Sequence, residues 1–153
     1  MRPQPHPAYS YRDDPEVPAF DETRIHVVMD AECALCSRAA RRIARLDRED
    51  AVRIAPAQGA LGQALLRHYG MRPDDPETWL LVEEGRAYGS LDAMLRLFPR
   101  LSVIYAPLRV LSALPFGLQD WIYARIARNR YRIFGRADLC ALPDAAVQSR
   151  LVR

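Results

Sequence analysis

Two cysteines three residues apart are the residues of this chain best suited to chemistry. Cys33 and Cys36 follow a compact apolar run at residues 25–29 and open a stretch in which apolar residues recur at helical spacing. One helical turn apart, the two sulfurs lie on the same side of a helix, close enough to form a disulfide without large backbone movement. We therefore predict that the pair is redox-active.

The predicted position of the pair at the start of a helix favours a thiolate. The first-turn N–H groups and the helix dipole stabilise negative charge, and a Cys-x-x-Cys motif at a helix N-terminus commonly lowers a cysteine pKa. In such pairs the first cysteine is usually the exposed nucleophile and the second the buried resolving thiol. We expect Cys33 to attack and Cys36 to resolve, although the neighbouring carboxylate of Glu32 opposes thiolate formation.

Asp30 ends the apolar run and completes the candidate site. Its carboxylate is suited to capping the helix by accepting N–H bonds of the first turn. If burial raises its pKa, it is also suited to exchanging a proton with the cysteines. The two roles are compatible, and both stay open.

Two other interpretations of the pair remain. Half of a zinc site would need two further ligands, and Cys140, His6, His26 and His68 form no second close pair. Alternatively, the cysteines are inert apolar residues of a helix. The strand leading into the pair favours redox chemistry, so we predict no cofactor and no metal. We interpret Cys140 as structural or incidental, with a regulatory thiol as the less favoured alternative.

Composition sets the class of protein. The chain has 153 residues, half of them hydrophobic, which is enough for one domain with a core and excludes a disordered protein. Three cysteines form no disulfide scaffold and favour a reducing compartment. We see no signal peptide and no apolar run of membrane-spanning length, and therefore predict a cytoplasmic protein. All 22 basic residues are arginines, so any side-chain cation near Cys33 other than histidine is an arginine.

The elements that position the pair are expected in the order β-α-β-α-β-β-α. The predicted strands are 25–29, 52–55, 78–82 and 87–89, and the predicted helices are 33–47, 59–69 and 90–99, with Ser90 as the N-cap of the last. With a Cys-x-x-Cys at the first strand-to-helix junction, this order predicts an α/β, thioredoxin-like core at residues 23–100. The loop before the third strand usually approaches the disulfide through a cis-proline. Because Pro76 is slightly early, Glu77 or Thr78 is expected opposite the sulfurs.

The two flanking segments are expected to differ. Residues 1–22 carry five prolines among polar residues, and we predict an extended tail without a regular element, with parts pinned by Tyr9, Tyr11 and Phe20. Residues 101–153 are predicted to be a helical C-terminal extension packed on the core. Its main helix begins near Leu118 and places four residues on its apolar side: Leu118, Trp121, Ile122 and Ile126.

Five arginines make the end of this helix basic: Arg125, Arg128, Arg130, Arg132 and Arg136. A basic amphipathic helix can bind a membrane surface or nucleic acid, but it is more often a packed helix with a solvated face. We therefore expect no nucleic-acid partner and only a less favoured peripheral membrane contact.

With these residues laid out, the sequence resembles the DCC family of thiol–disulfide oxidoreductase-like proteins. The usual Asp-Gly-x-Cys-x-x-Cys signature corresponds to residues 30–36, and the similarity runs from about 24 to 143, ending in Asn-Arg-Tyr-Arg-Ile-Phe-Gly-Arg at 129–136 and Cys140. The resemblance implies a thioredoxin-like fold and a dithiol–disulfide role for Cys33 and Cys36 with Asp30 beside them. Ala31 replaces the usual glycine and would strain the turn if the position needed a positive φ.

We expect a thiol–disulfide oxidoreductase acting on a protein or small-molecule disulfide or dithiol, with an unidentified electron donor. Two alternatives stay open. One is a non-enzymatic thioredoxin-like module that binds a protein or a membrane, and the other is a metal site built on Cys33, Cys36 and Cys140.

Overall fold

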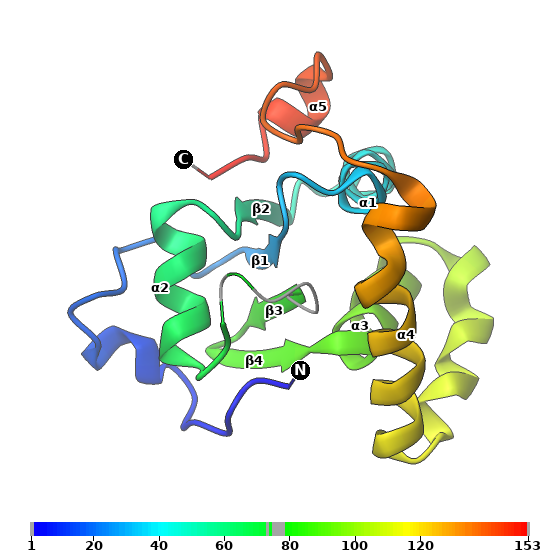
Figure 1. The fold of residues 1–153 in the computed structure, drawn as a ribbon. Coiled ribbons are helices and arrows are strands. Elements are labelled where there is room, and N and C mark those ends of the chain that lie inside the picture. The colour runs from blue at the N-terminus through cyan, green and yellow to red at the C-terminus, as the bar shows by residue number, and fades with distance from the viewer. Residues whose placement is uncertain (1, 73, 75–78, 153) are drawn as a thin grey trace.

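A four-stranded mixed sheet organises the chain, in a computed structural model that describes residues 2–72, 74 and 79–152. The strands are β1 (Ile25–Met29), β2 (Val52–Pro56), β3 (Trp79–Glu83) and β4 (Arg86–Gly89), in the spatial order β2-β1-β3-β4. β1 runs parallel to β2 and antiparallel to β3, which forms a hairpin with β4 (Figure 1). β1 is thus a central strand, and Asp30 is the first residue after its carboxyl end.

Alternating residues of β1 serve two cores, one on each face of the sheet. Val27 and Met29 pack with α1 (Ala34–Leu46), α3 (Ser90–Leu101) and α4 (Phe116–Phe134), whereas Val28 packs with α2 (Ala60–His68). Since the side chains of a strand point to opposite faces in turn, a run of apolar residues implies a strand covered on both sides. Figure 1 shows α2 on one side of the sheet and α1, α3 and α4 on the other.

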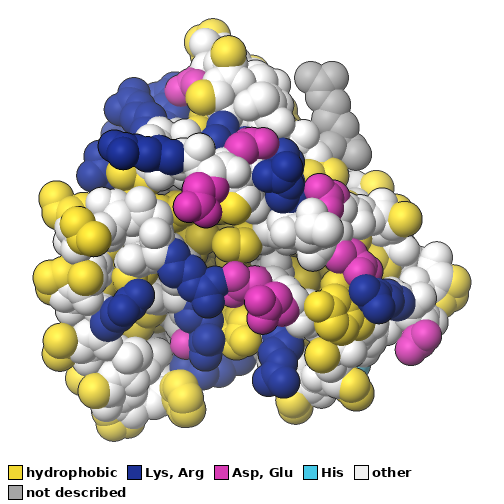
Figure 2. All heavy atoms as spheres, turned by 180° about the vertical axis from the view of Figure 1, so that it is seen from behind, with side chains coloured by type: hydrophobic (Ala, Val, Ile, Leu, Met, Phe, Trp, Pro, Cys, Tyr) yellow, Lys and Arg dark blue, Asp and Glu magenta, His cyan; other side chains and the backbone are white. Residues whose placement is uncertain are grey.

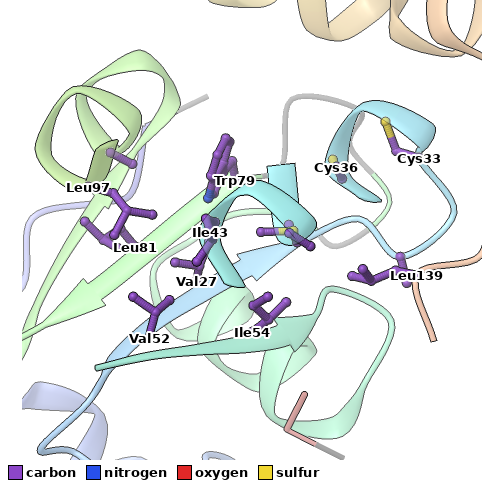
Figure 3. Packing of buried hydrophobic residues seen from close by; sticks show 14 of the residues in the cluster. Val27, Cys33, Cys36, Ile43, Val52, Ile54, Trp79, Leu81, Leu97 and Leu139 are labelled. Atoms are coloured by element: carbon purple, nitrogen blue, oxygen red, sulfur yellow. The ribbon is translucent and has the colours of Figure 1, made fainter. Parts of the chain in front are cut away.

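The apolar stripe of α1 explains how the helix that carries the cysteines is fixed. Cys36, Ala40 and Ile43 are buried at spacings of three and four residues, which face one side of a helix. In Figure 3, Ile43 lies over Val27 of β1. The arginines of this helix fall between the buried positions, so one face binds the sheet and the other meets solvent.

The observed order β-α-β-α-β-β-α matches the expectation from sequence and is consistent with a thioredoxin-like fold. Two details differ. Gly89 rather than Ser90 is the N-cap of α3, and Pro99 lies inside the last turn of that helix instead of ending it. Pro76, Glu77 and Thr78, expected opposite the sulfurs, lie outside the described residues.

The prediction of an extended N-terminal tail without a regular element is wrong. Residues Ser10–Asp13 form a 3-10 helix, η1, and Tyr11 is buried in the core that contains α2. The backbone is also anchored, because Gln4 donates to the carbonyl of Tyr69 and Tyr9 donates to that of Gly85, both at 2.8 Å. Burial of the aromatic residue Tyr11 and the backbone hydrogen bonds therefore hold this segment on the core, although it is rich in proline.

The predicted buried face of the C-terminal helix is also wrong. α4 buries Gln119, Tyr123, Ala127 and Arg130, while Trp121 is 65% exposed. Apolar residues occur on more than one side of α4, so spacing alone does not select the packed side. The buried side carries Arg130, whose ionic partner lies in the loop after β1, and this pairing orients the helix.

Two short elements flank α4: the 3-10 helix η2 (Val103–Ala113) before it and α5 (Ala145–Gln148) after it. η2 buries none of its residues and exposes Val103, Ile104 and Val110. Arginine and acidic side chains alternate with hydrophobic ones over the face shown in Figure 2. No helix of the described residues is both long and apolar enough to cross a bilayer. The division into residues 1–22, 23–100 and 101–153 stays a prediction.

Candidate active site

The two cysteines lie where the strand-to-helix junction was expected. Cys33 is the N-cap of α1, with extended backbone angles, and Cys36 lies in the first turn of the helix, as Figure 3 shows. Both thiols are free. The fold thus joins Asp30, Cys33 and Cys36 within one loop and one helical turn.

The expected burial of Cys36 is confirmed, but the expected exposure of Cys33 is wrong, because both residues are buried. Cys33 has no exposed surface, and Cys36 is 8% exposed. Residues 135–139, here called the strap, follow α4 and pair with the backbone of the cysteine loop, so they cover one side of Cys33. Ala137 donates to the carbonyl of Glu32 at 3.0 Å, and Leu139 donates to that of Ala31 at 2.7 Å.

Gly135 lets the chain turn from α4 into the strap. Its φ of +79° lies in the region that glycine adopts readily and other residues do not. Its carbonyl accepts a hydrogen bond from Ala34 at 3.3 Å, so the turn itself touches the first residue of α1. Cys33 and Arg136 form an isolated antiparallel bridge next to this contact.

The pKa values of the two thiols shift in opposite directions. The Cys36 thiol, donating to the Cys33 sulfur, lowers the pKa of Cys33 to about 6; burial opposes this shift, whereas the backbone N–H groups of Cys36 and Leu35 and the charge of Arg130 support it. The same hydrogen bond, with burial, raises the pKa of Cys36. Cys33 is therefore the thiolate of the pair and Cys36 the proton carrier, although the strap hides the thiolate.

Arg130 is the functional residue that sequence reasoning missed as a member of the site. Its side chain is buried, with Nη2 at 2.5 Å from Asp30 Oδ2 and Nη1 at 3.8 Å from the Cys36 sulfur. The absence of lysine had already restricted the nearby cation to arginine or histidine. The Asn-Arg-Tyr-Arg motif in the family resemblance was the signal that could have selected this arginine.

Asp30 accepts hydrogen bonds on both carboxylate oxygens. Oδ1 accepts from the Glu32 backbone and from Gln58 Nε2, each at 2.8 Å. Oδ2 accepts from Arg130 and from the hydroxyl of Tyr131. Because none of these donors belongs to the first turn of α1, the prediction that Asp30 caps this helix is wrong.

The raised Asp30 pKa on which a role in proton exchange was conditional is not found. Burial alone would raise this pKa, but the hydrogen bonds from Tyr131, Glu32 and Gln58 and the charge of Arg130 together lower it. A carboxylate with such donors stays ionised and holds Arg130 against the sulfurs. Asp30 is thus a fixed anion of the site, and the condition for proton exchange with the cysteines, a raised pKa, is not met.

Ala31 fits the active-site turn without strain. It is not among the residues with positive φ, and its amide donates to Gln58 Oε1 at 3.1 Å. The glycine usual in the motif is therefore not needed for this backbone shape, and its replacement leaves the positions of Asp30 and the cysteines intact.

The remaining candidate residues lie in other settings. Cys140 is exposed, His26 contacts the carbonyl of Asp21, and His68 lies between Ser10 and Asp14. Within residues 2–72, 74 and 79–152, no group of three His, Cys, Asp or Glu residues could hold a metal ion. The described part of the chain thus gives no support to a metal site.

Comparison with known proteins agrees with this geometry. The model of the DCC1-like thiol–disulfide oxidoreductase family matches residues 27–136, a range that contains both cysteines, Asp30 and Arg130. The uncharacterised protein YuxK of Bacillus subtilis is 28% identical over 126 residues, covering 82% of this chain and 92% of YuxK. A chloroplastic DCC family protein of Arabidopsis thaliana is 31% identical over 125 residues, covering 80% of this chain and 73% of the relative. No solved structure is matched.

Proposed function

Because the chain belongs to the DCC1-like thiol–disulfide oxidoreductase family, we propose that it catalyses thiol–disulfide exchange with Cys33 and Cys36 as the reactive pair. The observation that carries the proposal is the arrangement of the two sulfurs beside buried Arg130, at the start of α1. A thiolate is the nucleophile in disulfide exchange, and this arrangement favours a thiolate at Cys33 at neutral pH.

The proposed reaction has two steps. Cys33 thiolate attacks one sulfur of a protein or small-molecule disulfide and forms a mixed disulfide, releasing the first thiol of the substrate. Cys36 then loses its proton and attacks Cys33, which releases the second substrate thiol and leaves a Cys33–Cys36 disulfide. An electron donor, which the sequence does not identify, then reduces the Cys33–Cys36 disulfide to the dithiol.

Arg130 and Asp30 have supporting roles in this proposal. The guanidinium stabilises negative charge on either sulfur as it passes from Cys33 to Cys36, while the Asp30 carboxylate holds the guanidinium in place. The strap must shift before a folded protein disulfide can reach Cys33, since this cysteine has no exposed surface. The cytoplasm is the compartment that we propose for the protein.

The proposal is tested by equilibrating the protein in glutathione redox buffers, trapping free thiols and locating them by peptide mass. We expect a reversible Cys33–Cys36 disulfide with a potential of roughly −120 to −270 mV, the range of working dithiol enzymes. Cys140→Ser should leave this potential unchanged. Absence of the disulfide over the whole range would reject the proposal.

A second variant separates the enzyme from a binding module built on the same fold. Cys33→Ser should abolish reduction of a disulfide substrate, whereas a module that only binds a partner would keep its function in this variant. Circular dichroism of Cys33→Ser gives the control for folding.

A further inference from the structure

A second route to the cysteine pair lies on the side of Cys36. A pocket of about 400 Å³ opens between α1, α3 and α4, with Cys36, Arg130 and Trp79 in its lining. This volume falls within the range of roughly 300–1,000 Å³ typical of small-molecule sites. We call it the Cys36 pocket. A molecule of that size reaches Cys36 there without displacing the strap.

The lining of the Cys36 pocket selects an uncharged, apolar occupant. Its walls include Leu35 and Ala39 of α1, Met94 and Phe98 of α3, and Phe134 of α4. Among the described residues that line it, none carries a carboxylate or an amide side chain. A hydrophilic disulfide such as oxidised glutathione would lose its hydration there without replacement.

Two buried N–H groups on lining residues add a polar requirement. Arg130 is 4% exposed and Trp79 is 5% exposed, yet Arg130 Nε and Trp79 Nε1 have no acceptor within the described part of the chain. Both groups can only donate. Both atoms lie behind the surface of the pocket wall, so a ligand reaches them only when the wall shifts. A ligand that brings carbonyl oxygens and no donors would then offset the cost of the two buried donors.

We propose that the Cys36 pocket binds a compact apolar quinone and that the dithiol reduces it. A quinone combines a flat apolar ring, two carbonyl acceptors and the capacity to take up two electrons. This inference rests on the proposed dithiol function and assigns that function an oxidant.

The step balances in atoms and electrons. Cys33 thiolate forms the S–S bond with Cys36 while the S–H bond of Cys36 breaks, and the two electrons pass to the quinone. One quinone oxygen takes the proton of Cys36 and the other takes a proton from solvent, giving a hydroquinone and the Cys33–Cys36 disulfide. Cys36, the cysteine that lines the pocket, thus delivers its proton directly.

The test uses reduced full-length protein and 2,3-dimethyl-1,4-naphthoquinone, whose substituted ring resists arylation of thiols. We expect one hydroquinone per protein, measured by absorbance, together with the Cys33–Cys36 disulfide, located by peptide mass. Binding is followed separately by quenching of tryptophan fluorescence. Trp121→Phe leaves Trp79 as the single tryptophan, because the chain has two.

A matched pair of variants localises the binding. Ala39→Leu adds a larger side chain to the pocket wall and should weaken quinone binding about tenfold, since overfilling a packed site is unfavourable. Ala124→Leu makes the same change at a half-buried position of α4 outside the pocket and should leave binding within about twofold of wild type.

The outcomes separate this inference from the proposed function. Disulfide formation with oxidised glutathione but not with the quinone would overturn the quinone assignment and leave the proposed function standing. Failure with both oxidants would reject the proposed function. Saturable quenching without formation of hydroquinone would also overturn the assignment, because the pocket would then bind an apolar side chain of a substrate and not an oxidant. Equal effects of Ala39→Leu and Ala124→Leu on binding would overturn it as well.

Discussion

Two buried aspartate–arginine pairs join the C-terminal part of the chain to its first helix. Arg130 contacts Asp30 at one end of α1, and Arg150 contacts Asp47 at the other, with nitrogen–oxygen distances of 2.5 and 3.1 Å. Each pair spans about 100 residues of sequence. The two differ in what surrounds the charges.

The Asp47–Arg150 pair is saturated with hydrogen bonds. Asp47 accepts from the backbones of Ala51 and Val52, each at 3.0 Å. All three side-chain nitrogens of Arg150 donate, to the Asp47 side chain and to the carbonyls of Asp47 and Ala146. Such a pair fixes the turn after α1. All side-chain nitrogens of Arg150 are already engaged in hydrogen bonds within the fold.

The Asp30–Arg130 pair is incomplete by comparison. Arg130 keeps one nitrogen without an acceptor among the described residues and places another at 3.8 Å from the Cys36 sulfur. Its charge thus reaches the sulfur of a thiol, a group that can ionise. The same two residue types stabilise a fold when every donor is used, and stabilise a thiolate when the pair borders sulfur.

Removal of the saturated pair should have the largest effect on stability. We expect Asp47→Ala to lower the free energy of unfolding by about 3–5 kcal/mol, because it removes the carboxylate paired with buried Arg150 and leaves Arg150 Nε and two backbone N–H groups without their acceptor. Urea denaturation measures the change. The exposed partner of Arg72 provides the control: Asp74→Ala should cost less than about 1 kcal/mol. A changed Cys33 titration in Asp47→Ala would contradict the separation of the two pairs.

The pH dependence of Cys33 should show the chemistry of the incomplete pair. Because the pKa of Cys33 is lowered to about 6, its thiolate absorbance in the ultraviolet should be half developed near that pH and fall roughly tenfold per pH unit well below it. Cys33→Ser should remove this step, while Cys140→Ser should keep it. A lowered pKa also means that ionised Cys33 stabilises the folded protein. Its contribution to the free energy of unfolding is fully present above the ordinary pKa of 9.0 and is lost as pH falls through about 6.

Loss of the charge of Arg130 should move this titration. Arg130→Met is expected to shift the Cys33 midpoint upward by roughly 1 pH unit, since a nearby cation favours the thiolate. Arg130→Lys keeps the charge and should stay closer to wild type. An unchanged midpoint in Arg130→Met would mean that the Cys36 thiol and the backbone N–H groups alone hold the thiolate. Thermal unfolding of both variants controls for folding.

The smallest expected effect is that of the Tyr131 hydroxyl, one of several donors to Asp30. Tyr131→Phe should destabilise the protein by about 1 kcal/mol and raise the pKa of Asp30, because a hydrogen bond to the carboxylate is lost. Urea denaturation at neutral and acidic pH measures both. Tyr105→Phe, which removes a hydroxyl bonded to Arg42 at the surface, should cost less. Equal costs would show that Asp30 does not depend on Tyr131.

The local part of this site could be predicted from the sequence. Residues 25–29 carry a continuous apolar run, and helical spacing begins near Cys33, so the strand, the junction and α1 follow from neighbouring residues alone. Asp30, Cys33 and Cys36 were identified for the same reason. Their places at the end of the strand and in the first helical turn are set by neighbouring residues, where periodicity and turn chemistry are informative.

The long-range part could not be predicted in this way. The spacing of α4 favoured Trp121 and Ile126 as the buried side, yet the helix buries Tyr123, Ala127 and Arg130. That choice depends on an anion 100 residues earlier, which no local pattern records. The exposure of Cys33 was misjudged for the same reason, since the strap that covers it is equally distant.

The distance between Arg130 and the cysteines also orders events during synthesis. Cys36 leaves the ribosome 94 residues before Arg130, a delay of roughly 5–20 s at ordinary translation rates. In that interval the nascent chain has neither the guanidinium nor the strap beside its thiols, so Cys33 lacks part of what lowers its pKa. The charge of Arg130 and the strap reach the pair together, when α4 docks. A polypeptide truncated before α4 would carry the motif without the guanidinium and the strap that border it.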